Sequence, residues 1–157
     1  MFRGTWRNFE HIFENDRNEL MQYSINQITA FLTEKSWALR QELLLKFVAR
    51  WVGFAIHSRE GDYITLLNYI NWGNVNTVYI SEHLDKEGLY VNSHEALFSI
   101  LHVLDRNGIY LSPKYQDIYQ SLQVIRQQFV TLYIYIYKII CCSLELLCML
   151  SNLAFSI

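Results

Sequence analysis

Proline and glycine are scarce in this sequence, which has one proline (Pro113) and six glycines among its 157 residues. These residues supply most tight turns and loops, so their scarcity argues against a loop-rich protein or a β-sandwich. The sequence also lacks any Asn-x-Ser/Thr glycosylation acceptor, and residues 1–19 are polar without the apolar run of a secretory signal. We therefore expect a cytoplasmic protein.

Cysteine and net charge are also limited. The three cysteines, Cys141, Cys142 and Cys148, lie in one apolar stretch, and an odd, clustered set is a poor disulfide framework. We interpret them as reduced, buried thiols. Thirteen basic and fifteen acidic residues give a formal net charge of −2, which provides no general attraction for nucleic acid. We expect no nucleic-acid partner.

Apolar residues are plentiful, at 52% of the chain, and aromatic residues reach 15%. Such a composition can bury a substantial core. The spacing of apolar residues is helical along most of the chain. It predicts helices over residues 8–32, 37–58, 66–72, 77–87, 93–106 and 113–129. Asn76 and Asn92 or Ser93 are the expected N-caps of two of these helices, and Ser112-Pro113 is a strong signal for a helix start.

One short pattern occurs three times: Gly, any residue, Tyr, an aliphatic residue, and then a Thr, Asn or Ser. Glycine can end a helix in the left-handed conformation, and the hydroxyl or amide side chain can cap the next helix. We expect each copy to join two helices. The copies are Gly61-Asp62-Tyr63-Ile64-Thr65, Gly88-Leu89-Tyr90-Val91-Asn92 and Gly108-Ile109-Tyr110-Leu111-Ser112.

These features predict an all-α fold, an irregular stack or bundle of about six to seven helices. A fragment of a HEAT/armadillo-like α-solenoid is one form of such a stack. The three glycines are unequally spaced, whereas a regular solenoid repeats at a fixed period. The solenoid and the closed bundle therefore both stay open at this point.

Residues 129–157 form an apolar tail in which Lys138 and Glu145 are the only charged residues. We expect residues 1–128 to form a helical domain and residues 129–157 an apolar C-terminal helix, packed on that domain or inserted in a membrane. Residues 132–137 (LYIYIY) alternate as in a strand, but their neighbours favour a helix. Such a helix aligns a polar row with seven-residue spacing, made of Thr131, Lys138, Glu145 and Asn152.

The sequence contains no pattern that specifies catalysis, a metal or a cofactor. His94 and His102 stand eight residues apart on a predicted helix, or about 12 Å, too far to hold one ion. No Gly-rich phosphate loop and no Gly-x-Ser-x-Gly motif occurs. We expect no catalytic residues, no metal and no cofactor.

The sequence thus favours a non-enzymatic helical module that binds another protein, or a fragment of a larger helical scaffold. The alternative is a small membrane-anchored protein with a cytosolic helical head and residues 129–157 as its transmembrane segment. Large aromatic side chains often dominate the energy of protein interfaces. The candidate contact residues are Trp6, Trp72, Tyr79, Tyr115 and Tyr119.

Overall fold

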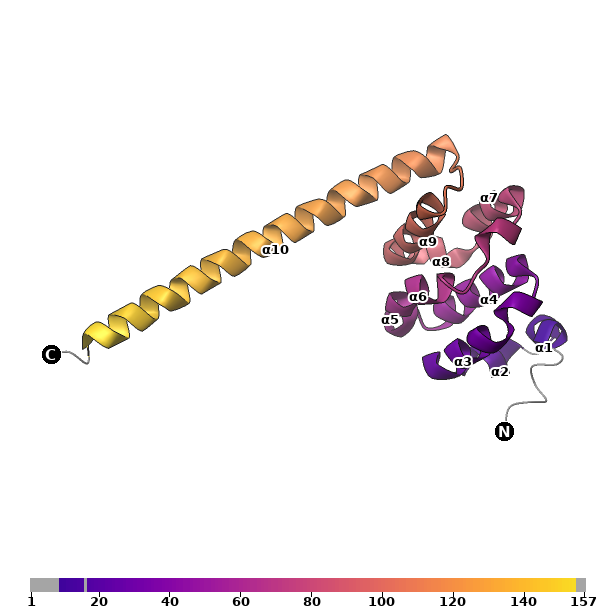
Figure 1. Ribbon diagram of the computed structural model, residues 1–157, viewed down its shortest axis with the longest axis horizontal. Coiled ribbons are helices and arrows are strands. Elements are labelled where there is room, and N and C mark those ends of the chain that lie inside the picture. The colour runs from indigo at the N-terminus through magenta and orange to yellow at the C-terminus, as the bar shows by residue number, and fades with distance from the viewer. Residues whose placement is uncertain (1–8, 16, 155–157) are drawn as a thin grey trace. The chain divides into compact units, whose positions relative to one another are not determined.

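The computed structural model describes residues 9–15 and 17–154, and the side chains of residues 9–14 and 19–141. Helices and short turns make up these residues, which contain no β-strand, so the predicted all-α class is confirmed (Figure 1). Two compact units can be distinguished, residues 1–115 and residues 116–157. The composition-based boundary between residues 128 and 129 stays a prediction.

The helix predicted over residues 8–32 is wrong, because the chain forms three helices there: α1 (Phe9–Asn15), α2 (Arg17–Met21) and α3 (Ile25–Lys35). A capping box at Ser24 starts α3. The backbone N–H of Gln27 donates to Ser24 Oγ (3.4 Å), and the backbone N–H of Ser24 donates to Gln27 Oε1 (2.8 Å). This reciprocal pair satisfies N–H groups that a helix start leaves open, so local capping prevails over the apolar spacing.

Helix α4 (Gln41–Phe54) lies at the centre of the first unit and contacts α2, α6 and α8. It is shorter than the predicted helix over residues 37–58. The 3₁₀ turn η2 (Ser36–Ala38) precedes it, and α5 (Ile56–Arg59) follows. Its own buried side chains cover most of the circumference of the helix. The buried apolar residues of α4 are Leu43, Leu44, Leu45, Phe47, Val48, Ala49, Trp51 and Val52.

Aromatic side chains attach the first helices to α4. The Phe47 ring makes edge contacts with the rings of Phe9, Phe13 and Phe31, at centroid distances of 5.0, 5.6 and 6.2 Å. Edge-to-face pairs at these distances add to the free energy gained from burying the rings. The indole N–H of Trp51 donates to the carbonyl of Tyr23 (2.9 Å), which satisfies the polar atom of a buried side chain.

The later part of the first unit consists of short helices: 3₁₀ turn η3 (Glu60–Asp62), α6 (Tyr63–Leu67), 3₁₀ turn η4 (Trp72–Asn74), α7 (Thr77–Lys86), α8 (Gly88–Asn92) and α9 (His94–Arg106). Two predicted N-caps are confirmed. Asn76 Oδ1 accepts from the Val78 N–H (2.8 Å), and Ser93 Oγ accepts from the Ala96 N–H (3.0 Å). Thr65 instead lies inside α6.

Of the three copies of the glycine pattern, only the one at Gly108 ends a helix in the left-handed conformation, as predicted. Gly108 has a φ of 68° and follows α9, where its N–H donates to Asp105 O (2.9 Å) and the Ile109 N–H donates to Leu104 O (3.0 Å). This is a Schellman motif. For the other two copies the prediction is wrong, since Gly61 lies within η3 and Gly88 is the first residue of α8.

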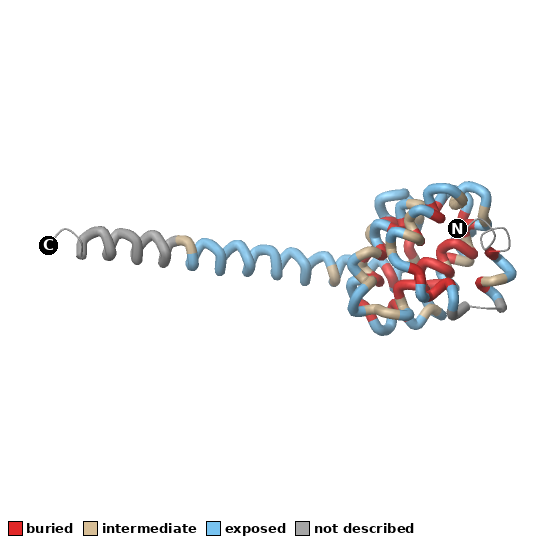
Figure 2. The backbone as a smooth tube through the Cα atoms, turned by 90° about the horizontal axis from the view of Figure 1, so that it is seen from below, coloured by how far each residue is buried: buried red, intermediate tan, exposed pale blue. Residues whose placement is uncertain are grey.

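Helix α10 (Pro113–Ala154) begins at the predicted start and is a single uninterrupted helix. The strand-like residues 132–137 are helical, as predicted, and the helix expected to end near residue 129 continues through the apolar tail. Figure 2 shows buried residues concentrated in the short helices and exposed residues along α10. Asn152, the last member of the polar row, is part of this helix, but its side chain lies outside those described.

Replacing Gly108 by Ala should lower the free energy of unfolding by about 1 kcal/mol, because a Cβ is strained at positive φ. Apart from its chain neighbours, no heavy atom lies within 4 Å of the added Cβ, so a steric clash with the rest of the fold does not contribute to the loss. Gly88→Ala is the matched control: Gly88 does not have a positive φ, and its added Cβ meets its nearest heavy atom at 3.9 Å. Chemical denaturation of both variants checks this, and equal losses would contradict the Schellman assignment.

Candidate interaction surface

A buried polar cluster joins α6, α7 and α8 inside the first unit. The hydroxyls of Tyr63 and Tyr90 are hydrogen-bonded at 2.6 Å, and the Tyr90 hydroxyl is hydrogen-bonded to His83 Nε2 at 2.9 Å. Burial, with smaller contributions from the positive charges of Arg50 and Lys46, lowers the pKa of His83 to about 4. Burial likewise raises the pKa of both tyrosines. The cluster is therefore uncharged near neutral pH and links three helices.

Two of the aromatic residues predicted to contact a partner, Trp72 and Tyr79, belong to η4 and α7 of the first unit. Trp72 is 7% exposed, and its indole N–H donates to the carbonyl of Leu67 (3.2 Å). The Tyr79 hydroxyl donates to the carbonyl of Glu42 (3.0 Å), which ties α7 to α4. Both polar groups thus bond within the fold.

Tyr115 and Tyr119 are each 5% exposed, and Trp6 lies outside the described residues. The Tyr115 hydroxyl donates to Asp85 Oδ1 (2.7 Å), which also accepts from Lys114 Nζ (2.7 Å). The bond from Lys114, followed by that from Tyr115, lowers the pKa of Asp85. This clamp holds the start of α10 against the end of α7. Within the first unit, Trp72, Tyr79 and Tyr115 belong to η4, α7 and the start of α10, and their role as partner contacts stays a prediction.

Large apolar side chains are instead exposed along α10. Phe129 is 67% exposed, and the Tyr and Ile residues that follow it are exposed on successive positions, so they cover every side of the helix. An exposed apolar surface of this extent is typical of an interaction site. The exposed members within the described side chains are Val124, Ile125, Phe129, Val130, Leu132, Tyr133, Ile134, Tyr135, Ile136, Tyr137, Ile139 and Ile140.

The exposed apolar surface begins before the predicted tail. Val124 and Ile125 precede residue 129, in a segment rich in glutamine, so the drop in charge that defines the tail could not identify them. The spacing of apolar residues along the helix, in contrast, does include Ile125.

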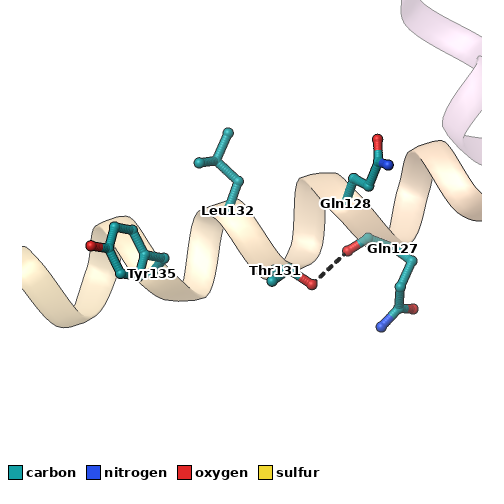
Figure 3. Close-up of a pocket in the computed structure, with 5 residues that line it drawn as sticks. All are labelled: Gln127, Gln128, Thr131, Leu132 and Tyr135. Carbon is teal, nitrogen blue, oxygen red and sulfur yellow. Dashed lines mark hydrogen bonds between the residues drawn. The ribbon is translucent and has the colours of Figure 1, made fainter.

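A shallow depression lies on the same helix (Figure 3). Thr131 Oγ1 donates to the carbonyl of Gln127 (2.9 Å) beside it. Because all the lining residues belong to α10, the depression is open and belongs to the helix surface. Its lining residues are Gln127, Gln128, Thr131, Leu132 and Tyr135.

Among the side chains that the structure describes, no group of three or more His, Cys, Asp or Glu residues could hold a metal ion. Over the same part of the chain, none of the helices combines the length and apolar character that crossing a bilayer requires. Comparisons of the chain with protein-family models, curated proteins and solved structures found no match.

Acid should destabilise the fold through His83. Its pKa of about 4 in the folded protein lies below the ordinary value of 6.5, so the unfolded chain binds the proton more tightly. Stability is therefore retained above pH 6.5 and falls, by up to about 1.4 kcal/mol per pH unit, as the pH drops from 6.5 towards 4. Denaturation of the native chain and of His83→Gln across this range measures the effect. The variant should have a shallower pH dependence, and identical slopes would refute the assignment.

Proposed function

We propose that this protein is a non-enzymatic helical module that binds another protein chain through α10. The observation that supports this proposal is the exposure of large apolar side chains on α10 from Val124 to Ile140. Their burial against a partner would contribute about 25 cal/mol for each Å² removed from water. The cytoplasm is the proposed location.

The chemistry of the described side chains supports a binding role over a catalytic one. His83, the histidine with a strongly shifted pKa, is hydrogen-bonded to Tyr90 and only 4% exposed, so it has little access to a substrate. A general base must lie within hydrogen-bond reach of the proton that it removes. We accordingly propose no catalytic residue and no cofactor.

The stack of short helices in residues 9–106 supports a scaffold role. In Figure 1 these helices follow one another through the first unit, and α4 contacts helices on both its N-terminal and C-terminal sides in the chain. We include in the proposal that this unit is a fragment of an irregular HEAT/armadillo-like α-solenoid. Its short helices bury their apolar faces against neighbouring helices, as the units of a solenoid do.

Affinity capture from cytosolic extract tests the binding proposal. The full chain should enrich at least one protein that a chain ending at Gln128 does not, because the truncated chain lacks most of the exposed apolar residues of α10. The measurement is quantitative mass spectrometry of both captures, with matched amounts of folded bait. Identical captured sets would contradict a binding role for α10.

The second candidate function is membrane anchoring by residues 129–157. The observation that favours it is that α10 continues as a helix to Ala154 while the sequence from residue 129 contains only two charged residues, Lys138 and Glu145. A helix that is apolar on all sides is suited either to a protein interior or to lipid.

Carbonate extraction of membranes from cells that express the full chain separates the two candidates. A chain that binds only other proteins should be released to the supernatant at high pH. A membrane-anchored chain should stay in the pellet, whereas a chain ending at Gln128 should be released. Release of the full chain would exclude the anchoring function.

A further inference from the structure

We propose that the partner of α10 is a second copy of this chain, which packs against it as a parallel, in-register coiled coil. This inference rests on the proposed function, since it identifies the protein that the exposed apolar helix binds. The observation that carries it is an apolar seam, defined here as Ile118, Leu122, Ile125, Phe129, Leu132 and Ile136.

The seam has the spacing of coiled-coil core positions. Its members alternate steps of four and three residues, which places Leu122, Phe129 and Ile136 at position a of a seven-residue repeat and Ile118, Ile125 and Leu132 at position d. An average step of 3.5 residues keeps one stripe of a helix facing its partner when two helices wind around each other. Apolar a and d positions sustained over several heptads are the sequence pattern of a coiled coil.

The seam crosses the border between the polar and the apolar part of α10. Before residue 129, most positions off the seam are polar, so the apolar residues there form a narrow stripe: Gln116, Asp117, Gln120, Ser121, Gln123, Arg126, Gln127 and Gln128 occupy the other sides. After residue 129 the seam continues in the same register although the other sides become apolar. Lipid has no preference for a particular stripe, whereas a partner helix does.

Four of the six seam residues are exposed in the second unit, and the other two, Ile118 and Leu122, are half-buried. Ile125 is 46% exposed, and Phe129, Leu132 and Ile136 are exposed as well. In the sequence beyond the described side chains, the register continues at Leu146, Leu150 and Leu153, with Ser143 as a polar exception.

The charges that flank the seam are compatible with a second copy. In a parallel, in-register pair, each g residue faces the e residue of the following heptad on the other chain. The described flanking pairs are Ser121 with Arg126, Gln128 with Tyr133, and Tyr135 with Ile140. Arg126 is the only charged residue among them, so two copies bring no like charges together along the seam.

The polar row predicted from the sequence has the same seven-residue period. Thr131 and Lys138 occupy position c, which lies about 130° around the helix from the middle of the a/d stripe, at 3.6 residues per turn. In the proposed pair this row faces away from the second copy, so Lys138 stays in contact with water.

A pair of adjacent substitutions tests the seam. Val124 (position c, 56% exposed) and Ile125 (position d, 46% exposed) are neighbouring β-branched residues of similar exposure. Ile125→Asp puts a charge into the proposed interface and should raise the dissociation constant of self-association at least tenfold. Val124→Asp should leave it within about twofold, because position c faces away from the second copy. Both variants lie outside the first unit, so circular dichroism of each should show that its helices are retained.

Sedimentation equilibrium of the full chain in density-matched detergent micelles gives the protein mass whether or not residues 129–157 bind lipid. The native chain and Val124→Asp should be oligomeric, and Ile125→Asp should shift towards the monomer. A monomeric native chain, or equal dissociation of both variants, would overturn the inference.

Cysteine cross-linking tests the orientation of the two copies. In chains whose three native cysteines are replaced by serine, Ile125→Cys should form an intermolecular disulfide under mild oxidation, and Val124→Cys should not. In a parallel pair the two d residues face each other, within the distance that a disulfide requires. Absence of the Ile125→Cys dimer would overturn the parallel arrangement.

The outcomes also separate this inference from the proposed function. A monomeric chain whose capture of other proteins still requires residues 129–157 would overturn the second-copy inference and leave the binding role intact. A monomeric chain whose captured proteins are unchanged by removal of these residues would overturn both.

Discussion

Burial of α4 is the interaction on which the rest of the first unit depends. Leu44, Leu45, Phe47 and Val48 of this helix have no exposed surface, and α2, α6 and α8 all contact it. The neighbouring helices are short, and isolated helices of fewer than about 12 residues are marginal in water. Their helical state therefore comes from packing on α4, and the capping bonds determine mainly where each helix begins.

Local signals in the sequence were sufficient to predict helix starts where the residue acts on backbone groups a few positions away along the chain. Asn76 and Ser93 are N-caps and Pro113 starts a helix, all as predicted, because each acts within three residues of itself. The apolar spacing of residues 8–32 gave the wrong helix bounds, since it contains no information about the competing capping box at Ser24. Gly88 and Gly108 share one sequence pattern, but of the two only Gly108 has a positive φ.

The candidate site could be predicted only in part, because residue type alone does not determine exposure. Trp72 and Tyr115 have polar atoms that bond within the fold and rings that are buried, so their size provides core packing. The sequence did identify the apolar tail, since a loss of charge over many residues is visible in composition. It did not identify Ile125, which lies in a segment rich in glutamine and whose proposed role depends on helical register.

The polar row and the apolar seam of α10 share the same seven-residue period. The polar row that contains Thr131 and Lys138 is visible in the sequence, because polar and charged residues are rare in the tail. The apolar seam is not visible there, because most of the residues around it are apolar as well. Ile118 and Leu122 lie in the polar segment and Phe129 in the apolar tail, yet they share one register. A lipid anchor would need apolar residues only in the tail, and these residues would not need a seven-residue spacing. A register that begins more than one heptad before the tail instead favours the proposed helical partner along residues 118–136.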